Sequence, residues 1–121
     1  MNRNFRLNYA IVAFVLAAVF NLHFGCSAES HIKPRFYSYQ QAVAWYQNQH
    51  NIEDIYPDSS AIYRAAYYES DHVLLLYFTS DHSKGYIFGD VPNNVWLEFK
   101  NASSKGRYYN TYIKGCYRFE L

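Results

Sequence analysis

The clearest indication of the fold is the segment Val73-Leu74-Leu75-Leu76-Tyr77-Phe78. Its length and its apolar residues are typical of a β-strand. Successive side chains of a strand point to opposite faces, and here both sets of alternate residues are apolar. A strand of this kind is covered on both faces. The sequence therefore predicts a sheet that lies between two further layers.

Two more strands are predicted, one before and one after this segment. Residues 60–69 form the first, and residues 69–72 contain the polar break that separates the two strands. Residues 80–85 are predicted to form the next turn, and Tyr86-Ile87-Phe88 a short third strand. Consecutive strands joined by short turns pair in antiparallel fashion. We expect a three-stranded antiparallel meander.

Two helices are predicted as the covering layers. Residues 91–102 carry apolar residues at helical spacing, and Pro92 suits a first helical turn. Residues 38–50 form the other helix, which Ser38 can cap, with Gln41 in the capping-box position. An apolar helix face must be buried somewhere, so the helix at 38–50 is a candidate for the second cover.

In that arrangement Trp45 or Tyr46 reaches the face of the sheet that contains Val73. Apolar and charged residues alternate at the end of the chain, so residues 113–121 are predicted to form a fourth strand or an extended tail. The fold class is α+β: a small antiparallel meander with a packed helix and a C-terminal strand or tail, preceded by one accessory helix.

The N-terminus has the pattern of a secretory signal peptide. Arg3 and Arg6 precede an apolar run, and cleavage after Ala28 would follow small residues. Three segments are therefore expected: a signal peptide at 1–28, an accessory segment at 29–57 and a domain at 58–121. The protein would be exported to the periplasm or secreted. Two alternatives remain: lipid attachment at Cys26 after Gly25, and an uncleaved membrane anchor.

The block from Ala102 to Gly115 combines a helix end with basic and aromatic residues. Gly106 is predicted to be a left-handed helix cap, and Lys105 to lie near the negative end of the helix dipole. Ser104-Lys105-Gly106, Tyr109-Asn110 and Ile113-Lys114-Gly115 stand at offsets that resemble the signature of the KTSC domain. This small module also occurs at the C-terminus of some lysyl-tRNA synthetases.

The resemblance spans residues 59–119 and implies RNA binding as a candidate activity. Family members often carry a central Tyr-x-Tyr, whereas this chain has Tyr86-Ile87-Phe88. A role that requires both hydroxyl groups is therefore not implied, but aromatic stacking is. The predicted residues for binding an anionic ligand are Lys105, Gly106, Arg107, Tyr108, Tyr109, Asn110, Lys114 and Tyr86. Turn and cap chemistry is the competing explanation for the same residue types.

Charge is distributed unevenly along the chain. Residues 29–83 contain three Lys or Arg and seven Asp or Glu, whereas residues 84–121 contain six and three. The C-terminal part is thus a modest basic patch. Two Asp-His pairs, at 71–72 and 81–82, would lie on the order of 20 Å apart along a strand, so they cannot share a metal ion. They are expected to be solvated turns, and Cys116 to be a buried thiol.

No arrangement of nucleophile, base and phosphate-binding loop is evident in the sequence, which argues against an enzyme and against a bound cofactor or metal. We expect a noncatalytic binding module whose partner is a nucleic acid or another anionic polymer. The alternative is a structural or protein-interaction component of the cell envelope that does not bind nucleic acid. In that case the aromatic surface of residues 38–50, especially Trp45 and Tyr46, would contact the partner.

Overall fold

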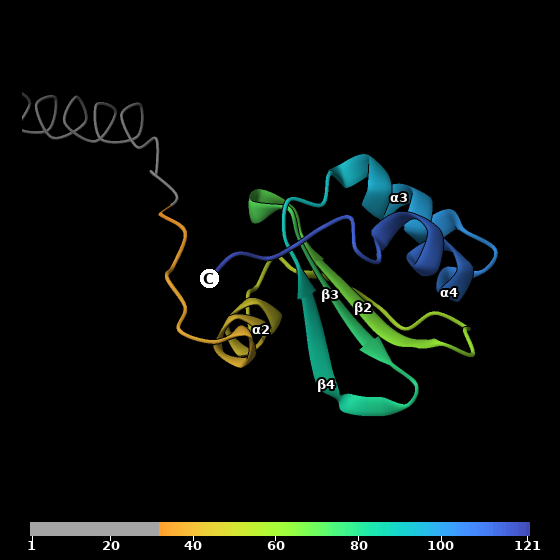
Figure 1. Ribbon diagram of the computed structural model, residues 1–121, viewed down its shortest axis with the longest axis horizontal. Coiled ribbons are helices and arrows are strands. Elements are labelled where there is room, and N and C mark those ends of the chain that lie inside the picture. The colour runs from red at the N-terminus through yellow and green to blue at the C-terminus, as the bar shows by residue number, and fades with distance from the viewer. Residues whose placement is uncertain (1–31) are drawn as a thin grey trace, which may run out of the picture. The chain divides into compact units, whose positions relative to one another are not determined.

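The computed structural model describes residues 32–121 (Figure 1). The predicted signal peptide and Cys26 lie outside the described residues. Within them, no helix combines the length and the apolar composition needed to cross a membrane. The elements in chain order are helix α2 (Tyr39–Gln47), strands β1 (Glu53–Ile55) and β2 (Ile62–Tyr68), a 3₁₀ turn (Glu69–Asp71), strands β3 (Val73–Phe78) and β4 (Asp81–Phe88), helices α3 (Asn93–Asn101) and α4 (Lys105–Tyr108), and a π-helical turn (Tyr109–Ile113).

The four strands form one antiparallel sheet in the order β1-β2-β3-β4. The α+β class and the antiparallel meander are confirmed, but the prediction of three meander strands missed β1. Its three residues, Glu53 to Ile55, pair with residues 65–67 of β2. A strand of three residues with two exposed acidic side chains has no apolar alternation to reveal it.

Strand β4 begins earlier than predicted. Residues 80–85 were expected to be a turn, but pairing with β3 starts at Asp81, opposite Phe78. The register then shifts across a bulge, so that Tyr77 lies opposite Gly85. The first four residues of β4 are exposed and polar, and their strand conformation depends on pairing with β3 rather than on burial. This is why their composition indicated a turn.

Two apolar clusters cover the two faces of the sheet, as the sequence predicts. Helix α2 packs on the face that contains Val73, and Tyr46 is buried there. Helix α3 packs on the opposite face, where Trp96 and Phe99 are buried against Leu74. Figure 1 shows α2 on one side of the sheet and α3 with α4 on the other. Burial of Tyr46 removes it from the aromatic surface expected to face a partner.

The helix boundaries differ only slightly from prediction. Ser38 caps α2, because its Oγ accepts a hydrogen bond of 3.2 Å from the backbone N–H of Gln41. Helix α3 begins at Asn93 rather than at 91. Pro92 occupies the cap position, where its extended backbone precedes the first turn and its carbonyl accepts hydrogen bonds from Val95 and Trp96.

The C-terminal tail is extended and forms no strand. Its aromatic residues do not share one face, as a strand would require: Tyr117 packs against the cluster under α3, whereas Phe119 is buried in the cluster under α2. Between them the tail passes Gly89, where a Cβ atom would lie 3.1 Å from Cα of Phe119. The tail therefore crosses the end of β4 from one face of the sheet to the other, and the alternative of a fourth strand is wrong.

Candidate binding groove along strand β4

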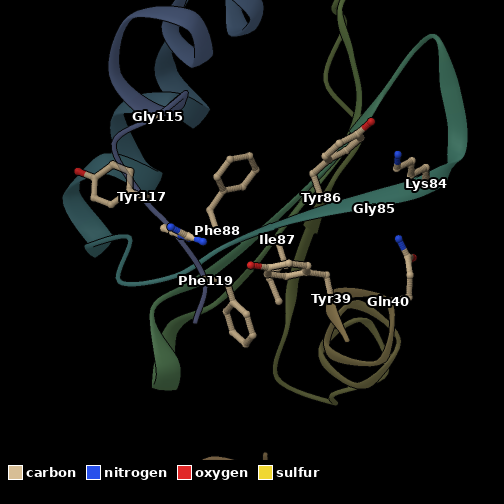
Figure 2. A pocket seen from close by; sticks show the side chains of 11 residues that line it. Tyr39, Gln40, Lys84, Gly85, Tyr86, Ile87, Phe88, Gly115, Tyr117 and Phe119 are labelled. Atoms are coloured by element: carbon tan, nitrogen blue, oxygen red, sulfur yellow. The ribbon is translucent and has the colours of Figure 1, made fainter. Parts of the chain in front are cut away.

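A groove with a volume of about 560 Å³ runs along β4, the strand at one edge of the sheet. Three segments that are distant in sequence line it (Figure 2). Tyr39 and Gln40, in the first turn of α2, form one wall. Gly115 and residues 117–119 of the tail form another, and residues 84–88 of β4 lie between them. The groove therefore depends on the tertiary fold rather than on any one segment.

Glycines allow both walls to approach β4 closely. A Cβ atom at Gly85 would lie 2.6 Å from Cγ1 of Val43 in α2, and one at Gly89 would lie 3.0 Å from the carbonyl oxygen of Arg118. Any side chain at these positions would push the helix or the tail away. Because the tail crosses at Gly89, it closes one end of the groove. Within the described chain β4 pairs only with β3, so its outer edge is unpaired from Lys84 to Ile87. Lys84 and Tyr86 are exposed on this stretch, whereas Gly85 is buried under α2.

The groove combines aromatic and positively charged side chains. Tyr39 and Tyr86 are 45% and 41% exposed, although both are large and largely apolar. Lys84 lies over the ring of Tyr86, with its Nζ 5.1 Å from the ring centroid, and this cation–π contact leaves the ammonium group accessible. Arg118 supplies a second exposed cation. None of the eleven residues of the described chain that line the groove is acidic, so the groove favours a negatively charged ligand.

Lys105, the first of the predicted anion-binding residues, has a structural role. Its Nζ donates hydrogen bonds to the carbonyl oxygens of Lys100 and Ala102, at 2.8 and 2.5 Å, and so neutralises the C-terminal end of α3. Its predicted position near the helix dipole is confirmed. Because the ammonium group is part-buried in these contacts, it is poorly placed to bind an external anion.

The prediction that Gly106 is a left-handed cap is wrong. Helix α3 ends at Asn101 with Ala102 as its C-cap, and among the described glycines only Gly115 has a positive φ, of 77°. Gly106 lies inside α4 instead, where a Cβ atom would come within 2.9 Å of Cβ of Ala61. Glycine therefore fits this position because α4 packs tightly against the chain just before β2, and a larger residue would force one of the two segments to shift. Sequence alone cannot distinguish these two uses of a glycine.

Two of the predicted tyrosines also make intramolecular contacts. Tyr108 donates a hydrogen bond of 2.8 Å to Oε2 of Glu98, and its burial and this bond raise its pKa above the usual value. Tyr109 is partly buried with its ring 5.1 Å from that of Phe78, and burial raises its pKa as well. Both side chains therefore pack within the domain.

The remaining predicted residues lie on different surfaces. Arg107, in α4, and Asn110, in the π-helical turn, are exposed, and Arg107 and Tyr112 line a shallower groove of about 310 Å³. Lys114 is exposed at the end of the π-helical turn. Tyr86 is the one predicted residue that lines the groove along β4. Tyr39, Lys84 and Arg118, which also line this groove, are not among the predicted residues, and no local pattern connects these three positions.

Asp71 departs from the expected solvated turn, because it is buried with 3% exposure. Its Oδ2 accepts a hydrogen bond of 2.7 Å from the hydroxyl group of Tyr46, which connects α2 to the 3₁₀ turn. Burial, together with the neighbouring carboxylate, raises the pKa of Tyr46.

The other members of the two Asp-His pairs, His72, Asp81 and His82, are exposed as expected. Across residues 32–121, no three His, Cys, Asp or Glu side chains are grouped as a metal site would require.

The prediction that Cys116 is buried is wrong. The thiol is exposed, in the turn that follows the π-helical segment. This turn contains Gly115 and faces solvent, because the chain must leave the cluster around Ile113 before it crosses β4. A single residue in an exposed turn has no neighbours in sequence that would reveal its exposure.

Comparison with known proteins identifies the segment that forms most of this fold. Residues 58–117 match the model of the KTSC domain family. A lysine–tRNA ligase from Nostoc punctiforme is 34% identical over 64 residues, which cover 53% of this chain but only 11% of the ligase. The crystal structure of a KTSC domain protein from Yersinia pestis is similar, with a TM-score of 0.51 and 27% identity; the match covers 55% of this chain and 92% of the other. This chain therefore belongs to the KTSC domain family through its residues 58–117.

Proposed function

We propose that this chain is a noncatalytic binding module that holds an anionic partner in the groove along β4. The observation that carries the proposal is the composition of that groove: two exposed cations, Lys84 and Arg118, lie among exposed tyrosines, and the described residues that line it include no carboxylate. Cations provide attraction to the partner, and aromatic rings provide apolar contact area. A volume of about 560 Å³ is within the range of ligand-binding sites.

The groove along β4 does not include the block at 105–114, which the sequence predicted as the anionic site. Lys105 and Tyr108 are held by α3 and by Glu98, which leaves Arg107 and Lys114 as the exposed cations of that block. The similarity to a segment of a lysine–tRNA ligase supports RNA as one candidate ligand. An acidic polymer is the other candidate, and it fits an exported protein better.

Export is part of the proposal. Cleavage after Ala28 would produce a chain that starts at Glu29, whereas lipid attachment would make Cys26 the first residue. The alternative function, an envelope component that does not bind nucleic acid, would use the same exported chain. The mass of the protein recovered from cell fractions distinguishes the two forms, and recovery of the full-length chain from the cytoplasm would contradict export.

The binding test compares two double variants that change charge equally. Lys84→Glu with Arg118→Glu alters the groove, and Arg107→Glu with Lys114→Glu alters the surface beside α4. All four side chains are exposed, so both variants should fold. The probes are fluorescent polyglutamate and an oligothymidylate of eight nucleotides, and anisotropy is measured at about 20 and 150 mM salt. These concentrations bracket weak and strong screening.

We expect the groove variant to bind at least one of the probes about tenfold more weakly than the unchanged chain, because two charge-assisted contacts are reversed. The other variant should differ by less than about threefold, which reflects long-range charge alone. Loss of binding only in the variant beside α4 would place the anionic site there and overturn the proposal. Failure of the unchanged chain to bind either probe at low salt would overturn the anionic function itself.

A further inference from the structure

Within the described chain the outer edge of β4 is unpaired, so it offers a ligand backbone groups as well as side chains. Alternate residues of an edge strand direct their backbone N–H and C=O groups away from the sheet, where a further strand can pair with them. β4 is an edge strand of eight residues, and the tail crosses it only at its end, near Gly89. The stretch from Lys84 to Ile87 forms the floor of the groove and is not paired on its outer side within residues 32–121.

On this basis we propose that the groove holds an extended, acidic polypeptide segment, which adds to the sheet as a fifth strand beside β4. The inference rests on the proposed function, because it names the class of anionic partner for the same site. The open stretch of four residues spans about 13 Å. A matching segment of the partner would therefore contribute about four to six residues. Main-chain hydrogen bonds would provide affinity, and side-chain contacts would provide specificity.

The charges of the groove argue for acidic residues in the segment. Lys84 lies on the open stretch of β4, and Arg118 lies on the tail that closes one end. Glutamate or aspartate residues near each end of the bound segment would meet these cations. Residues between them would contact the exposed rings of Tyr39 and Tyr86, which lie on the wall and on the floor of the groove (Figure 2).

The same charges disfavour a second copy of this chain as the occupant. A symmetric dimer places the same surface on both sides of the interface. Two grooves would then face each other, each with Lys84 and Arg118 and with no lining carboxylate among the described residues. Like charges across an interface are unfavourable, and a lysine on an edge strand discourages pairing between copies. A nucleic acid would satisfy the cations but lacks the alternating peptide N–H and C=O groups that pair with β4.

Backbone methylation of a peptide probe tests the pairing directly. The probe is a blocked octapeptide that alternates glutamate with valine, and the protein is the segment 29–121, which contains both apolar clusters in full. Two further probes carry N-methyl groups on alternate backbone nitrogens, one at odd and one at even positions. Only one of these sets faces β4 in a paired strand, so one methylated peptide should bind at least tenfold more weakly and the other about as well as the parent. A fourth probe has lysine in place of glutamate and should not bind.

Amide hydrogen exchange supplies the second measurement. Binding of the acidic peptide should protect alternate amides between Lys84 and Ile87 and leave the intervening ones unchanged. The variant Lys84→Glu with Arg118→Glu should lose both the binding and the protection. Arg107→Glu with Lys114→Glu again provides the charge-matched comparison.

Each other outcome overturns the inference in an identifiable way. If the oligothymidylate binds in the groove and the acidic peptide does not, the proposed function stands and the polypeptide partner is wrong. If the peptide binds but neither methylation pattern weakens it, side chains alone hold it and strand addition is wrong. If neither probe binds, both proposals fail. Concentration-dependent dimerisation that protects the amides of β4 without peptide would identify a second copy as the occupant.

Discussion

Lys105 and Gly106 are adjacent in the sequence, and each joins α4 to a different neighbour. Lys105 holds the end of α3 through its carbonyl groups, and Gly106 allows α4 to lie against Ala61. At the scale of single residues, positions that resemble a ligand-binding block are therefore used to pack a short helix. Arg107, the next residue of α4, has an exposed side chain.

Replacing Gly106 with alanine tests this packing role. The added Cβ atom would lie 2.9 Å from Cβ of Ala61, so one segment must shift. Alanine is the better helix former, but overpacking costs about 1–3 kcal/mol. We expect the free energy of unfolding, measured by urea denaturation, to fall by about 1–2 kcal/mol in Gly106→Ala. The double variant with Ala61→Gly should recover part of the loss. An unchanged or raised stability in Gly106→Ala would show that the two segments are not in tight contact in solution.

Strand β1 is joined to α3 by one carboxylate. Oε2 of Glu53 accepts a hydrogen bond of 2.8 Å from the indole N–H of Trp96, and Oε1 accepts one of 2.6 Å from Lys100. At the scale of elements, this contact holds the shortest strand of the sheet against the helix that covers it. The hydrogen bonds from Lys100 and then from Trp96 lower the pKa of Glu53.

A lowered pKa makes this contact dependent on pH. A carboxylate with a lower pKa in the folded state stabilises the fold above its unfolded pKa of about 4.3, and this contribution is lost as the pH falls through the folded value. The Glu53 side chain is half exposed, so solvent screening limits the effect to about 1 kcal/mol or less. We expect Glu53→Gln to lower the free energy of unfolding by about 0.5–1 kcal/mol at pH 7. The difference from the unchanged protein should shrink progressively below pH 4.

The exposed Glu69 provides the control for this measurement. Glu69→Gln removes the same charge from a turn. It should change the free energy of unfolding by less than about 0.5 kcal/mol at pH 7 and at pH 2. A Glu53→Gln deficit that persisted undiminished at pH 2 would mean that the ionised carboxylate is not what connects β1 to α3.

The whole molecule extends beyond the segment that matches the KTSC family. Helix α2 and β1 precede residue 58, and Phe119 follows residue 117, yet all three pack on the sheet of the matched segment. Without α2, the face that contains Val73, Leu75 and Tyr77 would lose its cover. Exposure of a contiguous apolar surface of this kind promotes association.

Truncation tests how far the matched segment depends on these additions. A chain of residues 58–121 should aggregate or bind hydrophobic dyes, because one face of its sheet is exposed. The chain 33–121 is the matched control, since it retains both clusters, and it should remain monomeric with cooperative unfolding. Sedimentation and thermal unfolding monitored by circular dichroism distinguish the two. A monomeric, cooperatively folded 58–121 would show that α2 is dispensable for the core and available to a partner.

Local patterns determined much of this fold. The two-sided apolar composition of β3 predicts a covered sheet, the spacing of apolar residues predicts both helices, and Ser38 marks the start of α2. These features follow from interactions between residues close in the chain, or from the simple requirement that apolar faces be buried. The residues of the KTSC signature likewise identify the family before any coordinates are considered.

Only the tertiary structure determined the rest. The conformation of β1 and of the first half of β4 comes from pairing with partner strands, and the path of the tail comes from two clusters on opposite faces. The groove depends on all of these at once, because Tyr39, Lys84 and Arg118 meet only after α2, β4 and the tail have packed. The spacing of apolar residues in the sequence indicates which face of each segment is buried. Contacts between distant segments depend instead on how the segments pack together in space.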